Sequence, residues 1–234
     1  MSKHIGIVGC SAEGAGLCYR TICLEGAQFL GVHNHPEVSL HTHALARYVD
    51  YLDAADWEGV AELMLSSASK LDAAGADFLI CPDNTIHQVM ARVLPRSPLP
   101  WLHIAEVVAA EAQRLGYRKI GITGTRWLVD SHVYPDKLDE AGLAWLRPDA
   151  QDRDEVDRII MEELVRGVMR PEAVTSLRAV IGRLKEDGCD AVVLGCTELP
   201  LIMNDENSPL PTLDSTRLLA RAALHRACEV DVPR

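Results

Sequence analysis

Residues 75–85 read GADFLICPDNT, and residues 188–198 read GCDAVVLGCTE, an alignment that needs no gap. Each stretch begins as a short apolar run, typical of a buried strand, and ends in reactive and hydrogen-bonding side chains. A match of this kind between the two halves of a chain indicates two copies of one structural unit. In the register of the repeat, Asp83 corresponds to Cys196, so these two residues are expected to occupy equivalent places.

A second match supports the duplication. The sequence IGIVG at Ile5–Gly9 returns as IGITG at Ile120–Gly124, in the same order and at nearly the same offset as the first match. A helix expected after the second copy can pack back on the first. We therefore predict one domain from residues 1–103 plus 212–234 and a second domain from residues 104–211.

Short apolar runs alternate with amphipathic helical stretches, which is the pattern of parallel βαβ units. The expected strands are Ile5–Val8, Phe29–Val32, Asp77–Cys81, Lys119–Thr123, Leu143–Leu146 and Ala191–Leu194. The expected helices are Trp57–Ala74, Ile104–Leu115, Asp154–Arg166, Pro171–Glu186 and Asp214–Cys228. Asp56 precedes the first of these helices as its N-cap. We therefore predict an α/β fold with two similar Rossmann-like domains, each built on a parallel sheet.

The composition is that of a globular chain, with 234 residues of which 48% are hydrophobic. The start MSKHIGIVG has no charged-then-apolar leader, and no apolar run reaches the ~18 to 20 residues that a bilayer requires, so we expect a cytoplasmic protein with no membrane partner. Seven cysteines without a Cys-x-x-Cys pair predict reduced thiols. The net charge of −11 argues against nucleic acid as a partner, but a local pocket can still hold a small anion.

The loops after the repeated strands are the candidate site. Ligands of parallel sheets bind beyond the carboxyl ends of the strands, so two units that face each other would place Asp83 and Cys196 on opposite sides of one cleft. A thiol at the start of a helix is stabilised as thiolate by backbone amides and by the helix dipole, which makes Cys196 a candidate nucleophile or base. A buried structural cysteine is the alternative, and it is the preferred interpretation of most of the other cysteines.

Short polar side chains share these two loops. Asn84, Thr85 and Thr197, together with amides at the helix starts, suit a carboxylate or a developing enolate oxygen, with turn capping as the alternative. His87 and Glu198 could each orient the neighbouring base or polarise a substrate. For His87 a histidine satisfied within its helix is an equally good interpretation.

The loop after the first strand, Gly9–Gly16, can bring its backbone close to a ligand, and its amides with Ser11 suit a small anion. It fits neither common phosphate-binding pattern, because Ala15 stands where a P-loop has lysine and the G-x-G-x-x-G spacing fails. We therefore expect no nucleotide cofactor.

Four histidines form two His-x-His pairs: His33, His35, His41 and His43. On a strand, both rings of a pair would lie on one face. A metal site would need further ligands in a defined geometry, and the sequence defines none. We therefore predict a histidine-rich loop beside the cleft, and no metal.

Taken together, these segments resemble the aspartate/glutamate racemase family of cofactor-independent enzymes. The resemblance covers almost the whole chain and rests on IGIVG followed by EG, AGADFLICPDNTIH, IGITGTRWLVDSHVY, GCDAVVLGCTELPLI and PTLDSTRLLARAA. Its most specific parts are GCTELP and DSTRLLARA. It implies two α/β domains related by pseudo-twofold symmetry with the active site in the cleft between them, no cofactor, and a homodimer.

The family's chemistry fits a paired site. Racemisation removes a proton from one face of Cα and returns one to the other, so it needs an acid/base on each side of a planar, enolate-like intermediate. In the family these groups are typically two cysteines, and Cys196 matches the second of them. The resemblance assigns the remaining residues by position: Asn84, Thr85 and Thr197 to the substrate α-carboxylate, Ser11 and Thr125 to the rim, and His87 and Glu198 to supporting roles.

The chain departs from the family pattern at two places. The first loop usually reads Cys-Asn-Thr or Thr-Asn-Thr, but here Asp83 comes before Asn84, and Cys81 lies two residues earlier. An aspartate, with a pKa of ~3.9 in water, serves as a base only if the cleft desolvates it. The Pro-Asp-Arg element of aspartate-specific members is also missing, and Arg47 is a conjectural replacement for its arginine.

The sequence therefore predicts an amino-acid racemase or epimerase that transfers a proton at Cα of a carboxylate substrate between Cys196 and Asp83. Two alternatives remain open. One is a decarboxylase, isomerase or hydrolase of the same superfamily that uses the single cysteine. The other is a small-anion binding protein with degenerate catalytic residues.

Overall fold

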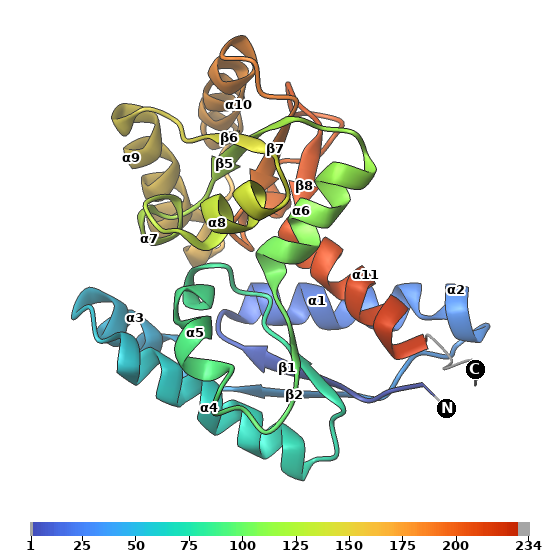
Figure 1. Ribbon diagram of the computed structural model, residues 1–234. Coiled ribbons are helices and arrows are strands. Elements are labelled where there is room, and N and C mark those ends of the chain that lie inside the picture. The colour runs from blue at the N-terminus through green and yellow to red at the C-terminus, as the bar shows by residue number, and fades with distance from the viewer. Residues whose placement is uncertain (1, 229–234) are drawn as a thin grey trace. The chain divides into compact units, whose positions relative to one another are not determined.

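The computed structural model describes residues 2–228, which form two compact units (Figure 1). Residues up to Ile104, together with the segment that starts at Thr216, form unit 1, and Ala105–Ser215 form unit 2. We expected the chain to return to the first domain after residue 211. Strand β8 (Thr212–Asp214) instead pairs with a strand of unit 2, so unit 2 extends through Ser215. Residues 229–234 of the expected first domain lie outside the described residues.

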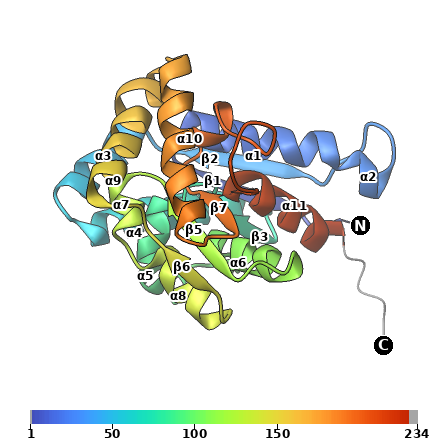
Figure 2. The ribbon, with the colours of Figure 1, turned by 90° about the horizontal axis from the view of Figure 1, so that it is seen from above.

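Unit 1 is built on four parallel strands in the order β2-β1-β3-β4. The strands are β1 (Ile5–Gly9), β2 (Val38–Thr42), β3 (Phe78–Ile80) and β4 (Trp101–Leu102). The helices are α1 (Ala12–Glu25), α2 (Ala27–Leu30), α3 (Leu45–Asp53), α4 (Trp57–Ala73), the 3-10 helix η1 (Thr85–Val89), α5 (Met90–Val93) and α11 (Ser215–Cys228). Helices α1 and α11 cover one face of the sheet, and α3, α4 and α5 cover the other (Figures 1 and 2).

Unit 2 has the same arrangement, with parallel strands in the order β6-β5-β7-β8. Its strands are β5 (Lys119–Thr123), β6 (Ala144–Leu146), β7 (Ala191–Leu194) and β8. Its helices are α6 (Ile104–Arg114), α7 (Arg126–Val129), α8 (Val133–Glu140), α9 (Ala150–Arg158), the π-helix η2 (Ile159–Glu163), the 3-10 helix η3 (Leu164–Arg166), α10 (Pro171–Glu186) and the 3-10 helix η4 (Leu199–Leu201). Helices α9 and α10 lie side by side (Figure 2), joined by an ion pair between Asp152 and Arg183.

The register of the two sheets confirms the prediction of two similar α/β units. In unit 1, Ile5 of β1 pairs with Phe78 of β3. In unit 2, Ile120 of β5 pairs with Ala191 of β7. These are the residues that the sequence repeat makes equivalent, so the duplication preserves which residue faces which across the centre of each sheet.

Helix α4 shows how local sequence fixes an element of unit 1. The Asp56 side chain accepts a hydrogen bond from the Gly59 amide at 2.9 Å, which satisfies one of the amides left open at the helix start. Val60, Met64 and Leu71 follow at helical spacing, and all three are buried against the sheet. The predicted helix Trp57–Ala74 is therefore confirmed apart from its final residue.

The prediction of a strand at Phe29–Val32 is wrong. Residues Ala27–Leu30 form the short helix α2, and the Phe29 ring packs edge to face on His225 of α11. The second strand of unit 1 is instead β2, Val38–Thr42. It lies at the edge of the sheet with side chains that are half-buried or exposed, so it lacks the apolar run that marks a buried strand.

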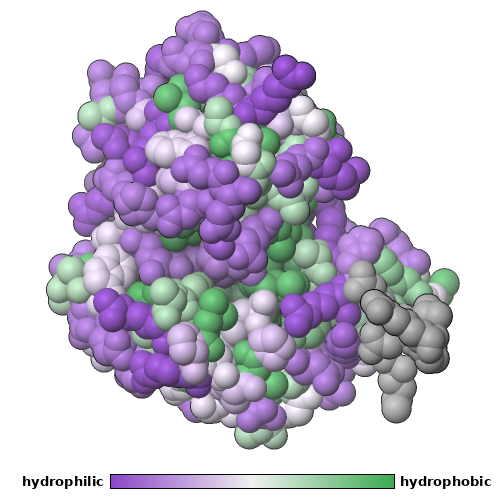
Figure 3. All heavy atoms as spheres, viewed as in Figure 1, coloured by the Kyte–Doolittle hydropathy of each residue, from purple (hydrophilic) through white to green (hydrophobic). Residues whose placement is uncertain are grey.

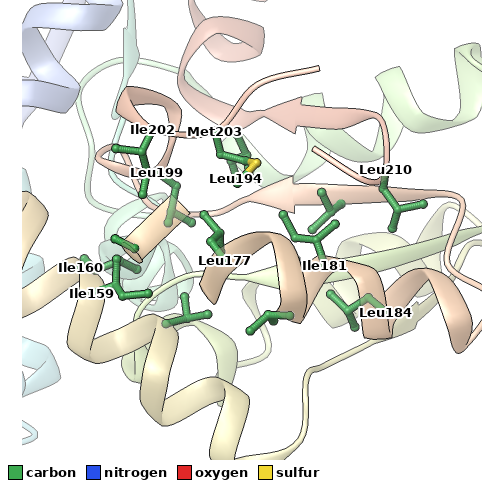
Figure 4. Packing of buried hydrophobic residues seen from close by; sticks show 14 of the residues in the cluster. Ile159, Ile160, Leu177, Ile181, Leu184, Leu194, Leu199, Ile202, Met203 and Leu210 are labelled. Atoms are coloured by element: carbon green, nitrogen blue, oxygen red, sulfur yellow. The ribbon is translucent and has the colours of Figure 1, made fainter. Parts of the chain in front are cut away.

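The predicted helix Asp154–Arg166 begins earlier and changes its winding. Asp149 caps α9 by accepting a hydrogen bond from the Asp152 amide at 2.9 Å, so the helix starts at Ala150. At Ile159 the α-helix gives way to the π-helix η2. The apolar residues of η2 pack with those of α10 and β7 in the core of unit 2 (Figure 4).

Hydrophilic side chains predominate on the face shown in Figure 3. In the part of the chain that the structure describes, no helix combines the length and the apolar character that a membrane span requires.

Candidate active site

Asp83 stands where the polypeptide leaves β3 and enters η1. Its Oδ1 atom accepts hydrogen bonds from the Thr85 amide at 3.1 Å and from the Ile86 amide at 3.4 Å. These amides lie at the start of a helical turn, where they have no partner within the helix. The carboxylate therefore has a fixed position at the carboxyl edge of the unit 1 sheet, and it remains partly accessible.

The other polar residues of this loop are buried. Asn84, Thr85 and His87 are each exposed by less than a tenth of their surface. The His87 Nε2 atom lies 3.0 Å from the Cys81 carbonyl oxygen, and because a carbonyl only accepts, Nε2 carries a proton. The His87 ring also packs edge to face on His103, with 4.5 Å between centroids. His87 therefore holds the chain at the end of β3 in place, and in this way it supports the loop that carries Asp83.

Cys81 is unsuited to replace Asp83 as a base. Its side chain is completely buried, and its Sγ atom lies 4.0 Å from the Asp83 carbonyl oxygen. Burial, followed by the charge of Asp83, raises the pKa of this thiol well above its usual value. Cys81 is therefore a neutral core thiol.

Ser11 lies at the same edge of the unit 1 sheet as Asp83. It is the N-cap of α1, and its Oγ atom accepts a hydrogen bond from the Gly14 amide at 3.1 Å. Strands β1 and β3 are neighbours, with Ile7 paired to Ile80, so the loops that follow them leave the sheet side by side. The structure thus gathers Ser11, Asp83, Asn84, Thr85 and His87 at one edge of unit 1.

Cys196 occupies the equivalent place in unit 2, just beyond β7. The residue before it must be glycine, because a Cβ atom at Gly195 would lie 2.5 Å from the Thr123 carbonyl oxygen. The Gly195 amide donates to that same oxygen at 2.9 Å. The turn is therefore pressed against the end of β5, and it presents a half-buried thiol.

The Cys196 thiol has a carboxylate as its hydrogen-bond partner. It donates to Glu198 Oε2 at 2.9 Å, and the Thr197 hydroxyl donates to the same oxygen at 2.8 Å. Both Thr197 and Glu198 are almost completely buried, whereas the thiol is partly accessible. A proton held between sulfur and carboxylate can be released or returned, so this arrangement suits an acid/base thiol.

Apolar anchors hold the segment that follows Cys196. Leu199, Ile202 and Met203 point into the unit 2 core and pack among side chains of η2 and α10 (Figure 4). The position of Cys196 is thus determined by tight backbone contact on one side and by core packing on the other.

Thr125 belongs to the same edge of unit 2. It is buried and is the N-cap residue of α7, directly after β5. Thr123 of β5 pairs with Leu194 of β7, which brings the two strand ends together. Unit 2 therefore gathers Thr125, Cys196, Thr197 and Glu198.

Ser215 also supports this edge, although it is not among the predicted site residues. The Ser215 hydroxyl is fully buried and donates to the Leu194 carbonyl oxygen at 2.9 Å, so it holds the end of β7 from which the Cys196 turn departs. The sequence does contain a pattern that could have indicated this role. In the stretch DST at residues 214–216, a serine follows a strand and opens a helix.

The four histidines separate into two environments. His33 and His35 lie in an exposed loop, and the His35 Nδ1 atom lies near the Pro36 carbonyl oxygen at 2.8 Å. His41 belongs to β2, and its ring contacts the ring of His43 edge to face at 4.9 Å. Among residues 2–228, no three or more His, Cys, Asp and Glu side chains are grouped so that they could hold a metal ion.

Comparison with known proteins gives consistent matches. A family model described as Asp/Glu/hydantoin racemase matches residues 7–223. The broad specificity amino-acid racemase RacX of Bacillus subtilis is 22% identical over 194 residues, which are 82% of each chain. A candidate Asp/Glu racemase from Yersinia pestis has a crystal structure with a TM-score of 0.89 and 31% identity, over 97% of this chain and 100% of that one. An aspartate racemase homologue from Pyrococcus horikoshii gives a TM-score of 0.84 and 27% identity, over 97% and 100% of the two chains.

Proposed function

Since the chain belongs to the Asp/Glu/hydantoin racemase family, we propose that it is a cofactor-independent amino-acid racemase or epimerase in which Asp83 and Cys196 transfer the Cα proton. Racemases are isomerases, and amino-acid racemase activity is the function that family membership supports. The observation that carries the assignment of the two residues is their equivalence: each follows the corresponding strand of its sheet, in the same register.

The protonation states favour one starting direction. In unit 1 the Asp83 carboxylate accepts two amide protons, as an ionised carboxylate does. In unit 2 the Cys196 thiol carries a proton that it donates to Glu198. Asp83 would take the proton from Cα of one enantiomer, and Cys196 would deliver its proton to the other face. The product is the opposite enantiomer, and the enzyme is left with a protonated Asp83 and a thiolate at Cys196.

Hydrogen-bond donors at both strand ends would stabilise the intermediate. Loss of the Cα proton places negative charge on the substrate carboxylate, and preorganised donors are most effective where charge develops. We assign this role to Asn84, Thr85 and Thr197, with Ser11 and Thr125 beside them, while His87 and Glu198 fix the two loops. Each is at the carboxyl edge of its own sheet.

Deuterium exchange tests the proposal. The purified protein is incubated in D2O with D- and L-amino acids, and the loss of the α-proton signal is followed by ¹H NMR. We expect exchange with the wild type, and a large loss with Cys196→Ser and with Asp83→Asn. If no amino acid in a broad panel exchanges its α-proton, the racemase proposal is wrong. Release of CO2, or ligand binding that Cys196→Ser leaves unchanged, would then point to one of the alternatives.

A cytoplasmic location and a homodimer are further parts of the proposal. They come from the sequence and from the family resemblance, and they stay predictions. Size-exclusion chromatography with light scattering would test the dimer, because a monomer has a mass of 25.7 kDa.

A further inference from the structure

Two histidines of unit 1 lie between a lysine and an arginine, on the face of the edge strand β2 that α4 covers. His41 belongs to β2 and His43 follows it, and both rings form hydrogen bonds with serines of α4. Lys70 of α4 contacts one ring, and Arg47 of α3 contacts the other. We call these residues, His41, His43, Arg47 and Lys70, the basic cluster. The proposed reaction assigns no role to it.

The contacts of His41 determine where its proton lies. Lys70 Nζ lies 3.0 Å from His41 Nε2, and His41 Nδ1 lies 2.9 Å from the Ser67 Oγ atom. An ammonium group can only donate, so Nε2 is the acceptor and the proton of the neutral ring is on Nδ1. His41 therefore donates to the buried Ser67, and its acceptor nitrogen is directed at a cation.

His43 repeats this arrangement with its two nitrogens exchanged. Arg47 Nη1 lies 3.4 Å from His43 Nδ1, and His43 Nε2 lies 3.2 Å from the Ser66 Oγ atom. A guanidinium group also can only donate, so the proton of this ring is on Nε2 and is directed at Ser66. The rings of His41 and His43 contact each other edge to face, with 4.9 Å between centroids. In the basic cluster, therefore, each cation donates to a neutral imidazole, and the two imidazoles are in contact.

The cations of the basic cluster differ from other arginines and lysines of the protein in their partners. Among the residues described, neither Lys70 nor Arg47 has a carboxylate oxygen within 4.0 Å. Arg96, Arg158 and Arg183, by contrast, each pair with an acidic side chain. The whole chain carries a net charge of −11, so the basic cluster is a local concentration of positive charge on an acidic protein. Such a concentration attracts small anions.

We propose that the basic cluster binds a tetrahedral oxyanion of the phosphate or sulfate class, and that His41 and His43 take up protons when it binds. A doubly charged oxyanion offers acceptors to both cations, so Lys70 and Arg47 turn from the ring nitrogens to the anion. Each ring nitrogen that they leave takes a proton from the solvent and becomes a further donor to the anion. This site goes beyond the proposed racemase activity and does not depend on it.

The groups around the two rings determine how binding depends on pH. Burial, and after it the charge of Lys70, lowers the pKa of both His41 and His43, and Arg47 acts on His43 in the same direction. The neighbour of His41 on β1 is the buried, apolar Val8, and the serines of α4 carry no charge. The rings of the free protein are therefore neutral near pH 7. A bound dianion raises the pKa of both rings, so the affinity for the anion increases as the pH falls.

Titration of the whole protein with sodium sulfate tests the proposal, because sulfate keeps its charge between about pH 6 and pH 8. We expect sulfate to change the ring ¹⁵N signals of His41 and His43 from the neutral to the imidazolium pattern, and His41→Gln and His43→Gln identify these signals. By calorimetry, sulfate should bind about tenfold more tightly at pH 6 than at pH 8. Sodium chloride at the same ionic strength is the control. Rings that stay neutral, or equal affinities at the two pH values, would overturn the proposal.

Surface substitutions test where the anion binds. Lys70 and Arg47 are exposed, so Lys70→Gln and Arg47→Gln should fold normally. Each should weaken sulfate binding about tenfold, because it removes one charge-assisted hydrogen bond. Lys185→Gln is the matched control, since it removes the same charge from an exposed position of α10 in unit 2, and it should leave the affinity unchanged. If all three variants bind sulfate equally well, the anion does not bind at the basic cluster and the proposal is wrong.

Two further titrations identify the source of the oxyanion. Inorganic phosphate is compared with glycerol 2-phosphate, which carries the same group as an ester. Both should compete with sulfate, and tighter binding of the ester would assign the basic cluster to a phosphorylated molecule, whereas tighter binding of the free ion would assign it to inorganic phosphate. If neither competes with sulfate, the basic cluster does not bind oxyanions as a class and the proposal fails.

Discussion

The loop after β3 and the loop after β7 have the same place in sheets of the same order, but they hold the two proposed acid/base residues differently. Asp83 is held by backbone amides of its own helical turn, whereas Cys196 is held by the side chain of Glu198. Backbone amides that donate to a carboxylate favour its ionised form. A carboxylate beside a thiol can accept a hydrogen bond from the protonated thiol, or it can take the proton and leave a thiolate. The two units thus share the same strand register, while Asp83 and Cys196 have different hydrogen-bond partners.

The largest loss of activity is expected from removal of the Cys196 thiol. We expect Cys196→Ser to lower kcat for α-proton exchange about 10³-fold, since a hydroxyl cannot replace the thiol as an acid/base near neutral pH. The rate would be measured by ¹H NMR in D2O. Cys23→Ser, in helix α1 of unit 1, is the control and should remain within about twofold of the wild type. Equal activity of Cys196→Ser and the wild type would contradict the role of Cys196.

Substitution of Asp83 tests whether the different residues of the two loops make the two enantiomers exchange their α-proton at different rates. Asp83→Asn should lose about 10²-fold in the direction that begins at Asp83. Asp83→Cys makes the two loops alike, so the exchange rates of the two enantiomers should become more similar and the overall rate should rise. Exchange of each enantiomer in D2O measures both effects. A slower Asp83→Cys variant would show that the site has adapted to the carboxylate.

The backbone contact beneath Cys196 is tested by Gly195→Ala. The added Cβ would lie 2.5 Å from the Thr123 carbonyl oxygen, so the free energy of unfolding should fall by about 1–3 kcal/mol. Urea denaturation would measure it. Gly182→Ala is the matched control, because a Cβ at Gly182 in α10 meets nothing within 4 Å and should stabilise the helix by about 0.5–1 kcal/mol. A stable Gly195→Ala variant would mean that the turn can move away from β5.

The smallest effect is expected at the partner of the thiol. Glu198→Gln keeps the shape of the side chain but removes the charge to which Cys196 donates, so kcat should fall by about tenfold. The rate of alkylation of Cys196 by iodoacetamide, measured against pH, would show whether the thiol ionises differently. Identical alkylation profiles for the variant and the wild type would exclude a direct influence of Glu198 on the thiol.

Much of the fold could be predicted from the sequence because the repeat and the buried strands are local patterns. The equivalence of Asp83 and Cys196 came from the alignment of two segments, and the sheet register agrees with it. The edge strand β2 escaped prediction because its half-exposed side chains carry no apolar signal. The short apolar run at Phe29–Val32 predicts a strand instead, but that run begins in helix α2, which packs on α11.

The supporting contacts of the candidate site could not be predicted in the same way. One hydrogen bond joins His41 to Ser67, and another joins Ser215 to Leu194. The partners are far apart in the sequence, so no local sequence pattern predicts these bonds.

The return of the chain to unit 1 has a consequence for biosynthesis. Helix α11 packs in unit 1, where Arg221 pairs with Glu25 of α1 and Arg226 lies over the Phe78 ring. Unit 2, by contrast, is formed by one continuous segment that ends at Ser215. A ribosome therefore synthesises all of unit 2 before it completes α11, the last element of unit 1. The synthesis of unit 1 begins earlier, but this unit lacks α11 until the end. One face of its sheet is therefore incompletely covered until α11 has been made.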